Sequence, residues 1–246
     1  YSMEEITNMI YFISQDQRSA TYSLELLNEA IVRRFQYGSE SSPYKYKDFD
    51  LSGLDDILVI GRGESAKNKS DEINSLIAKE NLTVFECNYI SEIVGEKNYC
   101  FSIKYNSFLE SLDELLNNKK EGVIGFPGVG QDIVEKVNAK KPIYLPYKIS
   151  NNKLVCSLES GISIPYDVVS MYTISTAVAL GAKKIYVAGF DGYKNNQDWL
   201  SQRMEAEMEE FFNLLKQNYP EVEIISITPT TYNIKKCSLY YLLNNL

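Results

Sequence analysis

Residues 56–66 read D-I-L-V-I-G-R-G-E-S-A, a short apolar run that ends in a loop with two glycines. Short apolar runs bounded by turn residues are typical of strands that are buried on both faces of a parallel sheet. From this stretch onward such runs alternate with amphipathic stretches. The pattern predicts an α/β fold, with a mostly parallel sheet sandwiched by helices.

The predicted α/β unit covers residues 51–246 and is expected to be Rossmann-like. Its strands are expected at 56–60, 82–87, 99–103, 122–126, 142–147, 184–190 and 223–228. Its helices are expected near 70–80, 106–117, 130–138, 166–181 and 197–217. Alternating apolar and polar side chains at 151–165 predict a hairpin or an irregular insertion.

Residues 1–50 differ from the rest of the chain. Residues 3–35 carry apolar stripes at helical spacing, and residues 38–50 are rich in Ser, Tyr, Lys and Asp, as linkers are. We therefore expect a helical appendage and a linker. No basic segment followed by an apolar run opens the chain, so no signal peptide is expected. The abrupt start inside amphipathic helices suggests a piece of a longer protein.

Composition excludes several classes of function. The chain has 25 basic and 33 acidic residues and a net charge of −8, so a nucleic-acid partner is not expected. No stretch has the roughly 18 apolar residues that a membrane span needs. The four cysteines lack CxxC spacing, which argues against a zinc ribbon and favours reduced thiols in a cytoplasmic protein. The chain has no histidine, so no imidazole of its own can serve as base, acid or ligand.

The first candidate site is the loop of residues 61–65, directly after the first predicted strand. Ligands of open α/β sheets bind outside the carboxyl ends of the strands. With Ala66 the loop matches the dinucleotide fingerprint GxGxxA, and Glu86 ends the next predicted strand, where an acidic residue would hold the ribose of NAD. The glycines allow the backbone to approach a ligand or an anion closely, but a turn that merely needs glycine explains them as well.

We discount NAD binding because of the residues that follow the loop. Helical spacing begins only at Ile73, with Ser70 as the expected N-cap, so the loop is too long for a tight turn at a pyrophosphate. Glu64 would also bring a carboxylate to the phosphates.

Two further strand ends carry polar residues. Asn88 and Tyr89 follow the second predicted strand, where an amide can donate to and accept from a base or sugar, although an Asx-turn explains Asn88 equally well. The predicted strand at 184–190 runs into Gly189-Phe190-Asp191-Gly192-Tyr193. Asp191 could accept from ribose hydroxyls, bind a metal, act as a base or cap the next helix. Tyr89, Tyr172, Tyr193 and Tyr232 are candidates to stack on a base, with core packing as the alternative.

Together these strand ends resemble a known family. The layout is a strand, G-x-G-x-S, a second strand that ends near C-N, and later A-x-A-L-G-x-K-x-I-Y-x-x-G-x-D, at residues 59–65, 85–88 and 177–191. Bacterial lipooligosaccharide sialyltransferases and the related flagellin-modifying and pterin pyrophosphokinase-like proteins share it. The chain resembles more closely the domains C-terminal to pyruvate-aldolase-like (HMG-CoA-lyase-type) barrels of bacterial surface-polysaccharide proteins, which show A-G-F-D-G-Y and end in I-x-x-I-T-P-T-x-Y, here residues 188–193 and 224–232.

The resemblance implies a site for CMP or a CMP-sugar, and a partner domain of the aldolase type. Gly61, Gly63 and Ser65 would lie near the phosphate or sugar, and Asn88, Gly189 and Asp191 near the cytidine and its ribose. The full set expected to contact the ligand is Gly61, Arg62, Gly63, Glu64, Ser65, Asn88, Tyr89, Ser170, Gly189, Phe190, Asp191, Gly192, Tyr193, Thr228, Pro229 and Thr230. The chain departs from the sialyltransferases at Glu64, where they have Pro, at Val168 and Val169, where they have Thr-Ser, and in lacking their catalytic histidine.

Three functions follow from these expectations. The first is a nucleotide-sugar glycosyltransferase whose base is Asp191 or a tyrosine. The second is a non-catalytic nucleotide- or sugar-binding accessory domain of an aldolase-type enzyme. The third is a pyrophosphokinase-like transferase with Mg²⁺ beside Asp191.

Overall fold

The computed structural model of the chain describes residues 56–103, 111, 113–115, 117, 120–125, 143–145, 147–150 and 153–245. The predicted appendage at 1–50 and the predicted helix near 130–138 lie outside these residues, as does most of the predicted helix at 106–117.

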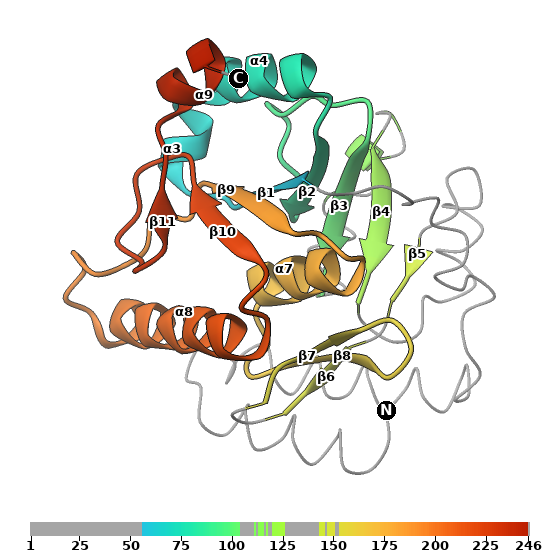
Figure 1. Cartoon of the computed structure of the whole chain (residues 1–246), viewed down its shortest axis with the longest axis vertical. Coiled ribbons are helices and arrows are strands. Elements are labelled where there is room, and N and C mark those ends of the chain that lie inside the picture. Colours follow the sequence, from blue (N-terminus) through green and yellow to red (C-terminus); the bar gives the residue numbers. More distant parts are fainter. Residues whose placement is uncertain are drawn as a thin grey trace.

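Among the described residues the main element is a sheet of eight strands in the order β11-β10-β9-β1-β2-β3-β4-β5 (Figure 1). Every neighbouring pair is parallel, so the predicted α/β fold with a mostly parallel sheet is confirmed. The strands are β1 Asp56–Ile60, β2 Thr83–Cys87, β3 Asn98–Ser102, β4 Glu121–Ile124, β5 Ile143–Tyr144, β9 Lys184–Ala188, β10 Glu223–Ser226 and β11 Lys235–Lys236.

The strand order reverses between β1 and β9. From β1 the chain moves outward on one side through β2, β3, β4 and β5, and it returns on the other side of β1 with β9, β10 and β11. β1 and β9 pair in register from Asp56↔Lys184 to Ile60↔Ala188. Because β1 is central and covered on both faces, its last four side chains are apolar and fully buried.

Helices cover both faces of the sheet (Figure 1). On one side α3 (Glu64–Lys67), α4 (Ser70–Glu80) and α9 (Leu239–Asn245) pack on Leu58 and Ile60 of β1. On the other side α7 (Val169–Ala179) and α8 (Trp199–Asn218) pack on Ile57 and Val59. Successive side chains of β1 point to opposite faces of the sheet, so the core has two layers, one on each face.

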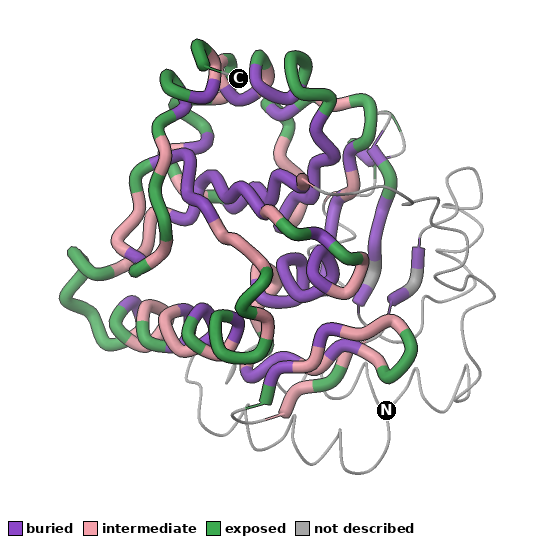
Figure 2. Tube along the Cα trace, viewed as in Figure 1, coloured by how far each residue is buried: buried purple, intermediate pink, exposed green. Residues whose placement is uncertain are grey.

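The helix α7 is buried nearly all round, as Figure 2 shows. It lies between the main sheet and a small second sheet, in the order β6-β8-β7, which is built from β6 (Tyr147–Ile149), β7 (Val155–Ser157) and β8 (Gly161–Ile164). A helix with sheet on two sides must be apolar on two sides. The predicted hairpin at 151–165 is confirmed as the antiparallel pair β7–β8.

Three local predictions were wrong or incomplete. The stretch predicted as a loop after residue 63 contains the short helix α3, and Lys69 rather than Ser70 is the N-cap of α4. In α3 only Ala66 is buried, so one helical turn leaves no apolar period to detect. The single strand predicted at 142–147 is wrong: Ile143 and Tyr144 form β5 of the main sheet, whereas Tyr147 begins β6 of the small sheet. The elements β11 and α9 were not predicted. Within the described residues, no helix combines the length and the apolar character required to cross a membrane.

Candidate functional site

The loops after β1 and β9 touch directly at the carboxyl edge of the sheet. The N–H of Gly61 donates to the C=O of Ala188 at 2.8 Å, and the N–H of Gly63 donates to the C=O of Gly189 at 3.0 Å. A Cβ on Gly61 would lie 2.6 Å from the Gly189 oxygen, and Gly189 itself has a φ of +70°. Gly61 and Gly189 are therefore needed because the two loops pack closely on each other, a reason that was not predicted from the sequence.

Ser65, Asp191 and Thr228 join these two loops to the loop after β10. Oδ2 of Asp191 accepts the N–H of Ser65 at 3.0 Å, and Oδ1 accepts the Ser65 hydroxyl. The Ser65 and Thr228 hydroxyl oxygens are 2.9 Å apart, and Thr228 Oγ1 accepts the N–H of Gly189 at 3.0 Å. Because the single Ser65 hydroxyl proton goes to Asp191, the Thr228 proton goes to Ser65. The result is one continuous chain of hydrogen bonds across three loops.

The Asp191 carboxylate lies at the N-terminus of α3. Ser65 is the second residue of that helix, and the N-cap Gly63 supplies no side chain of its own. A Cβ on Gly63 would lie 2.5 Å from Asp191 Oδ1, so glycine is required to admit the carboxylate. Amides at a helix N-terminus favour an anion, and in dinucleotide-binding folds that anion is the pyrophosphate. In this chain the anion is its own Asp191.

Glu205 of α8 was not predicted from the sequence, yet it holds two of the loops. Its Oε2 accepts the N–H of Tyr193 at 2.6 Å, and its Oε1 accepts the Thr231 hydroxyl at 2.6 Å. The N–H of Thr231 donates in turn to the C=O of Asp191 at 3.0 Å. A glutamate among the other acidic residues of an amphipathic helix gives no sequence signal for this role.

Arg62, Glu64 and Asn88 form the outer part of the edge. Arg62 and Glu64 are exposed, and Asn88 is half-buried in the left-handed conformation, with a φ of +64°. Within the described part of the chain, the side chains of these three residues make no hydrogen bond or ion pair. The Asx-turn considered for Asn88 is absent there, because the N–H of Ile90 donates to Glu86 instead. The described residues therefore leave the polar groups of these three side chains unbonded.

Glu86 holds the β2–β3 connection and not a ribose. It is fully buried, and its Oε1 accepts from Lys120 Nζ and Asn98 Nδ2, both at 2.8 Å. Its Oε2 accepts the N–H of Ile90 at 3.1 Å, and Lys120 also donates to the C=O of Ile90. Burial raises the pKa of the Glu86 carboxyl, and the Lys120 ammonium opposes that rise. The sequence argument against NAD binding agrees with this arrangement.

The side chains of several predicted residues take no part in the Ser65–Asp191–Thr228 chain of hydrogen bonds. The Ser170 hydroxyl donates to the sulfur of Met208 on α8 at 3.4 Å, and Thr230 Oγ1 accepts the N–H of Tyr232 at 3.2 Å. Tyr89 lies under the Lys120 ammonium, 4.4 Å from the ring centroid. Pro229 is exposed, and Phe190 is buried in the core.

Two of the tyrosines considered for base stacking belong to the core. Tyr172 is fully buried, and its hydroxyl donates to the C=O of Leu145 at 2.6 Å. Tyr232 is buried with its ring centroid 5.4 Å from that of Phe212. Burial also raises the pKa of the Tyr232 hydroxyl. The stacking hypothesis is therefore wrong for these two residues.

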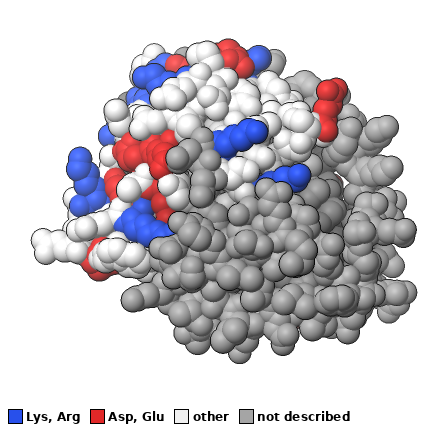
Figure 3. All heavy atoms as spheres, turned by 90° about the horizontal axis from the view of Figure 1, so that it is seen from below, with Lys and Arg blue, Asp and Glu red and all other residues white. Residues whose placement is uncertain are grey.

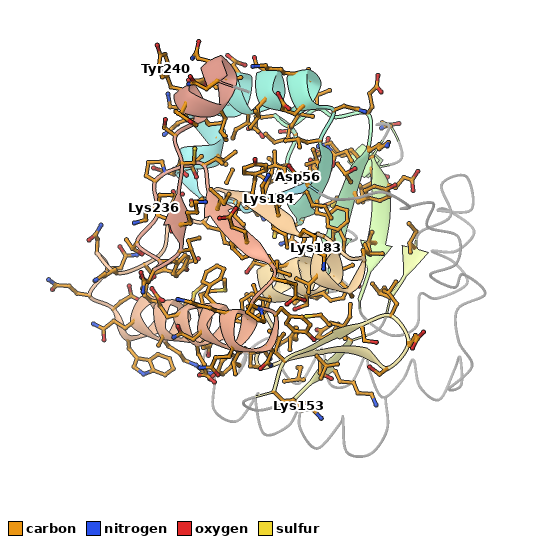
Figure 4. The ribbon with its side chains drawn as sticks, viewed as in Figure 1. Asp56, Lys153, Lys183, Lys184, Lys236 and Tyr240 are labelled. Carbon is orange, nitrogen blue, oxygen red and sulfur yellow. The ribbon has the colours of Figure 1, made fainter. Side chains whose placement is uncertain are left out.

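The amino edge of the sheet is built differently. Asp56 and Lys184, at the starts of β1 and β9, form an ion pair at 3.4 Å, and Lys183 is exposed beside them (Figure 4). On the face of the molecule turned toward the reader in Figure 3, basic and acidic side chains are interspersed over the described part. The amino edge offers a control surface for experiments on the carboxyl edge.

The surroundings of Asp191 supply few ligands for a Mg²⁺ ion. Its oxygens face the N–H and O–H donors of Ser65, whereas Mg²⁺ requires oxygen ligands in an octahedral arrangement. Over the described ranges, no group of three or more His, Cys, Asp and Glu side chains could hold a metal ion.

Comparisons of the chain with models of protein families, with curated proteins and with solved structures found no match. The likeness to sialyltransferase-type domains stays a prediction from the motifs.

Proposed function

We propose that the chain binds a nucleotide or nucleotide-sugar of the CMP type at the carboxyl edge of β1, β2 and β9. One observation carries the proposal. Residues 61–65 and Asp191 lie where the strand order reverses, and open parallel sheets bind their ligands at that point.

The outer side chains supply suitable chemistry for such a ligand. The exposed guanidinium of Arg62 can bind a phosphate through two parallel hydrogen bonds. The Asn88 amide can donate and accept together, as the edge of a base or a sugar requires. Arg62 and Asn88 each lie two residues past the last ladder pair, Ile60↔Glu86, so their backbones leave adjacent strands at the same level.

The motif likeness extends the proposal to a glycosyltransferase-like domain that uses a nucleotide-sugar in the biosynthesis of bacterial surface polysaccharides. Transfer to an acceptor hydroxyl requires a base within hydrogen-bonding distance. Among the residues of these loops, Asp191 is our candidate for that base. Each of its oxygens accepts one hydrogen bond from Ser65 and has a second lone pair that can accept a proton.

A second candidate is a non-catalytic nucleotide- or sugar-binding accessory domain of an aldolase-type enzyme. The observation in its favour is that both Asp191 oxygens already accept hydrogen bonds from Ser65, in a position that stabilises α3. A carboxylate committed in this way is a poor base. A Mg²⁺-dependent pyrophosphokinase-like transfer is disfavoured because Asp191 is the single carboxylate among these contacts and both of its oxygens already accept from Ser65.

Calorimetric titration with CMP, UMP, a CMP-sugar and a UDP-sugar tests the binding, and assay of released nucleotide tests the chemistry. We expect CMP and the CMP-sugar to bind more tightly than their uridine counterparts. Release of CMP that is lost in Asp191→Asn would support the transferase. Binding without release would support the accessory domain. A chain that binds none of the four compounds would contradict both.

A further inference from the structure

The carboxylate of Glu205 lies between the loop after β9 and the loop after β10 and binds both. Its oxygens accept the N–H of Tyr193 and the hydroxyl of Thr231, each at 2.6 Å. Hydrogen bonds to an ionised acceptor are roughly twice as strong as neutral ones. Since the N–H of Thr231 also donates to the C=O of Asp191, the two loops and α8 form one connected unit.

Gly192 shows how closely the loop after β9 passes this carboxylate. Its φ is +81°, and a Cβ there would lie 2.9 Å from Glu205 Oε2 and 1.8 Å from Thr231 Oγ1. The residue just before it is Asp191. That residue is thus fixed from two directions, by Ser65 through its side chain and by the Glu205 contacts through its neighbours.

Glu209, one helical turn later on α8, provides an internal comparison. Its Oε1 accepts the N–H of Asn233 at 3.0 Å. Like the bond from Tyr193 to Glu205, it joins a backbone N–H to a glutamate of α8. The two glutamates lie on the same face of the helix, because they are four residues apart. It holds the loop after β10 at a point beyond the predicted ligand residues Thr228, Pro229 and Thr230.

We propose that Glu205 is a positioning residue of the nucleotide site: it holds residues 191–193 and 228–231 in the arrangement that binds the ligand, without contacting the ligand. The inference rests on the proposed function. Apparent affinity falls with the fraction of molecules that hold the binding arrangement. Loss of the Glu205 contacts lowers that fraction and therefore weakens binding, while the residues that touch the ligand stay unchanged.

The test titrates CMP into the full chain and into three variants, and follows amide hydrogen exchange without ligand. Glu205→Ala removes both acceptors. Glu205→Gln keeps both contacts, because its amide oxygen can accept from Tyr193 and its NH₂ group can donate to Thr231 Oγ1. Glu209→Ala is the matched control. We expect Glu205→Ala to raise the Kd about tenfold, as a tenfold smaller binding-competent fraction requires. We expect Glu205→Gln to restore most of the affinity and Glu209→Ala to change it less than about twofold.

In the free chain Glu205→Ala should also speed exchange of the Tyr193 and Thr231 amides. Equal CMP affinity in wild type and Glu205→Ala would overturn the inference and leave the proposed function standing. So would an equal loss in Glu209→Ala, since that would mark a general loosening of α8. A wild-type chain that binds no CMP would overturn the proposed function and the inference with it. Should Glu205→Ala fail to fold, Thr231→Val removes only the hydroxyl donor and must weaken CMP binding in the same direction.

Discussion

Replacing Asp191 with alanine removes the anion that the chain places at the N-terminus of α3. The variant loses two charge-assisted hydrogen bonds, from the N–H and the hydroxyl of Ser65. Hydrogen bonds to charged groups contribute about 1.5–3 kcal/mol each where both partners are buried. Because Asp191 is only half-buried, we expect a combined loss of about 2–4 kcal/mol in the free energy of unfolding, the helix-terminus contribution included.

Urea unfolding at pH 7 measures this loss from the midpoint, with the slope held common to all variants. Asp191→Asn keeps the shape and one acceptor, so it should cost about 1 kcal/mol. The control is Asp56→Ala at the amino edge, which breaks a partly exposed ion pair and should cost less than about 1 kcal/mol.

Added phosphate provides a second readout of the same reasoning. Asp191→Ala leaves the Ser65 N–H and hydroxyl at the start of α3 without their anionic acceptor, so phosphate should stabilise this variant more than the wild type, by an amount that grows with the phosphate concentration. If Asp191→Ala costs no more than Asp56→Ala and responds to phosphate as the wild type does, the carboxylate does not stabilise α3, and the reasoning is refuted.

Three further predictions concern stability. Lys120→Met leaves the Glu86 carboxylate buried without a cation, so it should cost about 3–5 kcal/mol in chemical denaturation. Adding Glu86→Leu should recover part of that loss, because it removes the buried charge but leaves Asn98 Nδ2 and the Ile90 N–H without their acceptor. A double variant as unstable as the single one would contradict this. Burial raises the pKa of the Cys156 thiol from 9.0 to about 11, so the thiol loses its proton at a lower pH in the unfolded chain than in the folded one. The free energy of unfolding should therefore fall between pH 9 and 11, by up to about 1.4 kcal/mol per pH unit. Unfolding of Cys156→Ala at pH 8, 9 and 10 should show a shallower dependence of stability on pH, and an identical dependence would exclude the thiol as its cause. Gly63→Ala places a Cβ 2.5 Å from Asp191 Oδ1 and should lower the free energy of unfolding by about 1–3 kcal/mol. An unchanged midpoint of thermal unfolding would show that the loop can shift to accept the methyl group.

The strands and longer helices were predictable because their patterns are local. β1 was predicted at its observed bounds, and α4 and α8 to within two residues, since apolar runs and helical periods lie within single segments. The short helix α3 and the two-residue strand β11 contain too few residues to show a period. They exist because the tertiary structure supplies their partners.

The contacts of the candidate site were much harder to predict than its location. The strand ends pointed to the loops of Ser65 and Asp191, and the family resemblance pointed to Thr228. Ser65 and Asp191 are 126 residues apart, however, and nothing in the sequence pairs them. The packing of the 61–65 loop on the loop after β9 could not be predicted, because it depends on β9 lying beside β1. Glu205 and Lys120 have no local pattern, because their partners come from other elements of the fold.

Titration of CMP into the wild type, Asn88→Gly and Lys184→Ala tests the central claim most directly. Glycine tolerates the φ of +64° at position 88, so Asn88→Gly removes the amide without straining the backbone. We predict that CMP binds the wild type, that Asn88→Gly weakens binding about threefold to tenfold, as the loss of one hydrogen bond implies, and that Lys184→Ala at the amino edge changes nothing. A wild-type chain that does not bind CMP, or a loss in Lys184→Ala as large as that in Asn88→Gly, would contradict a nucleotide site at the carboxyl edge.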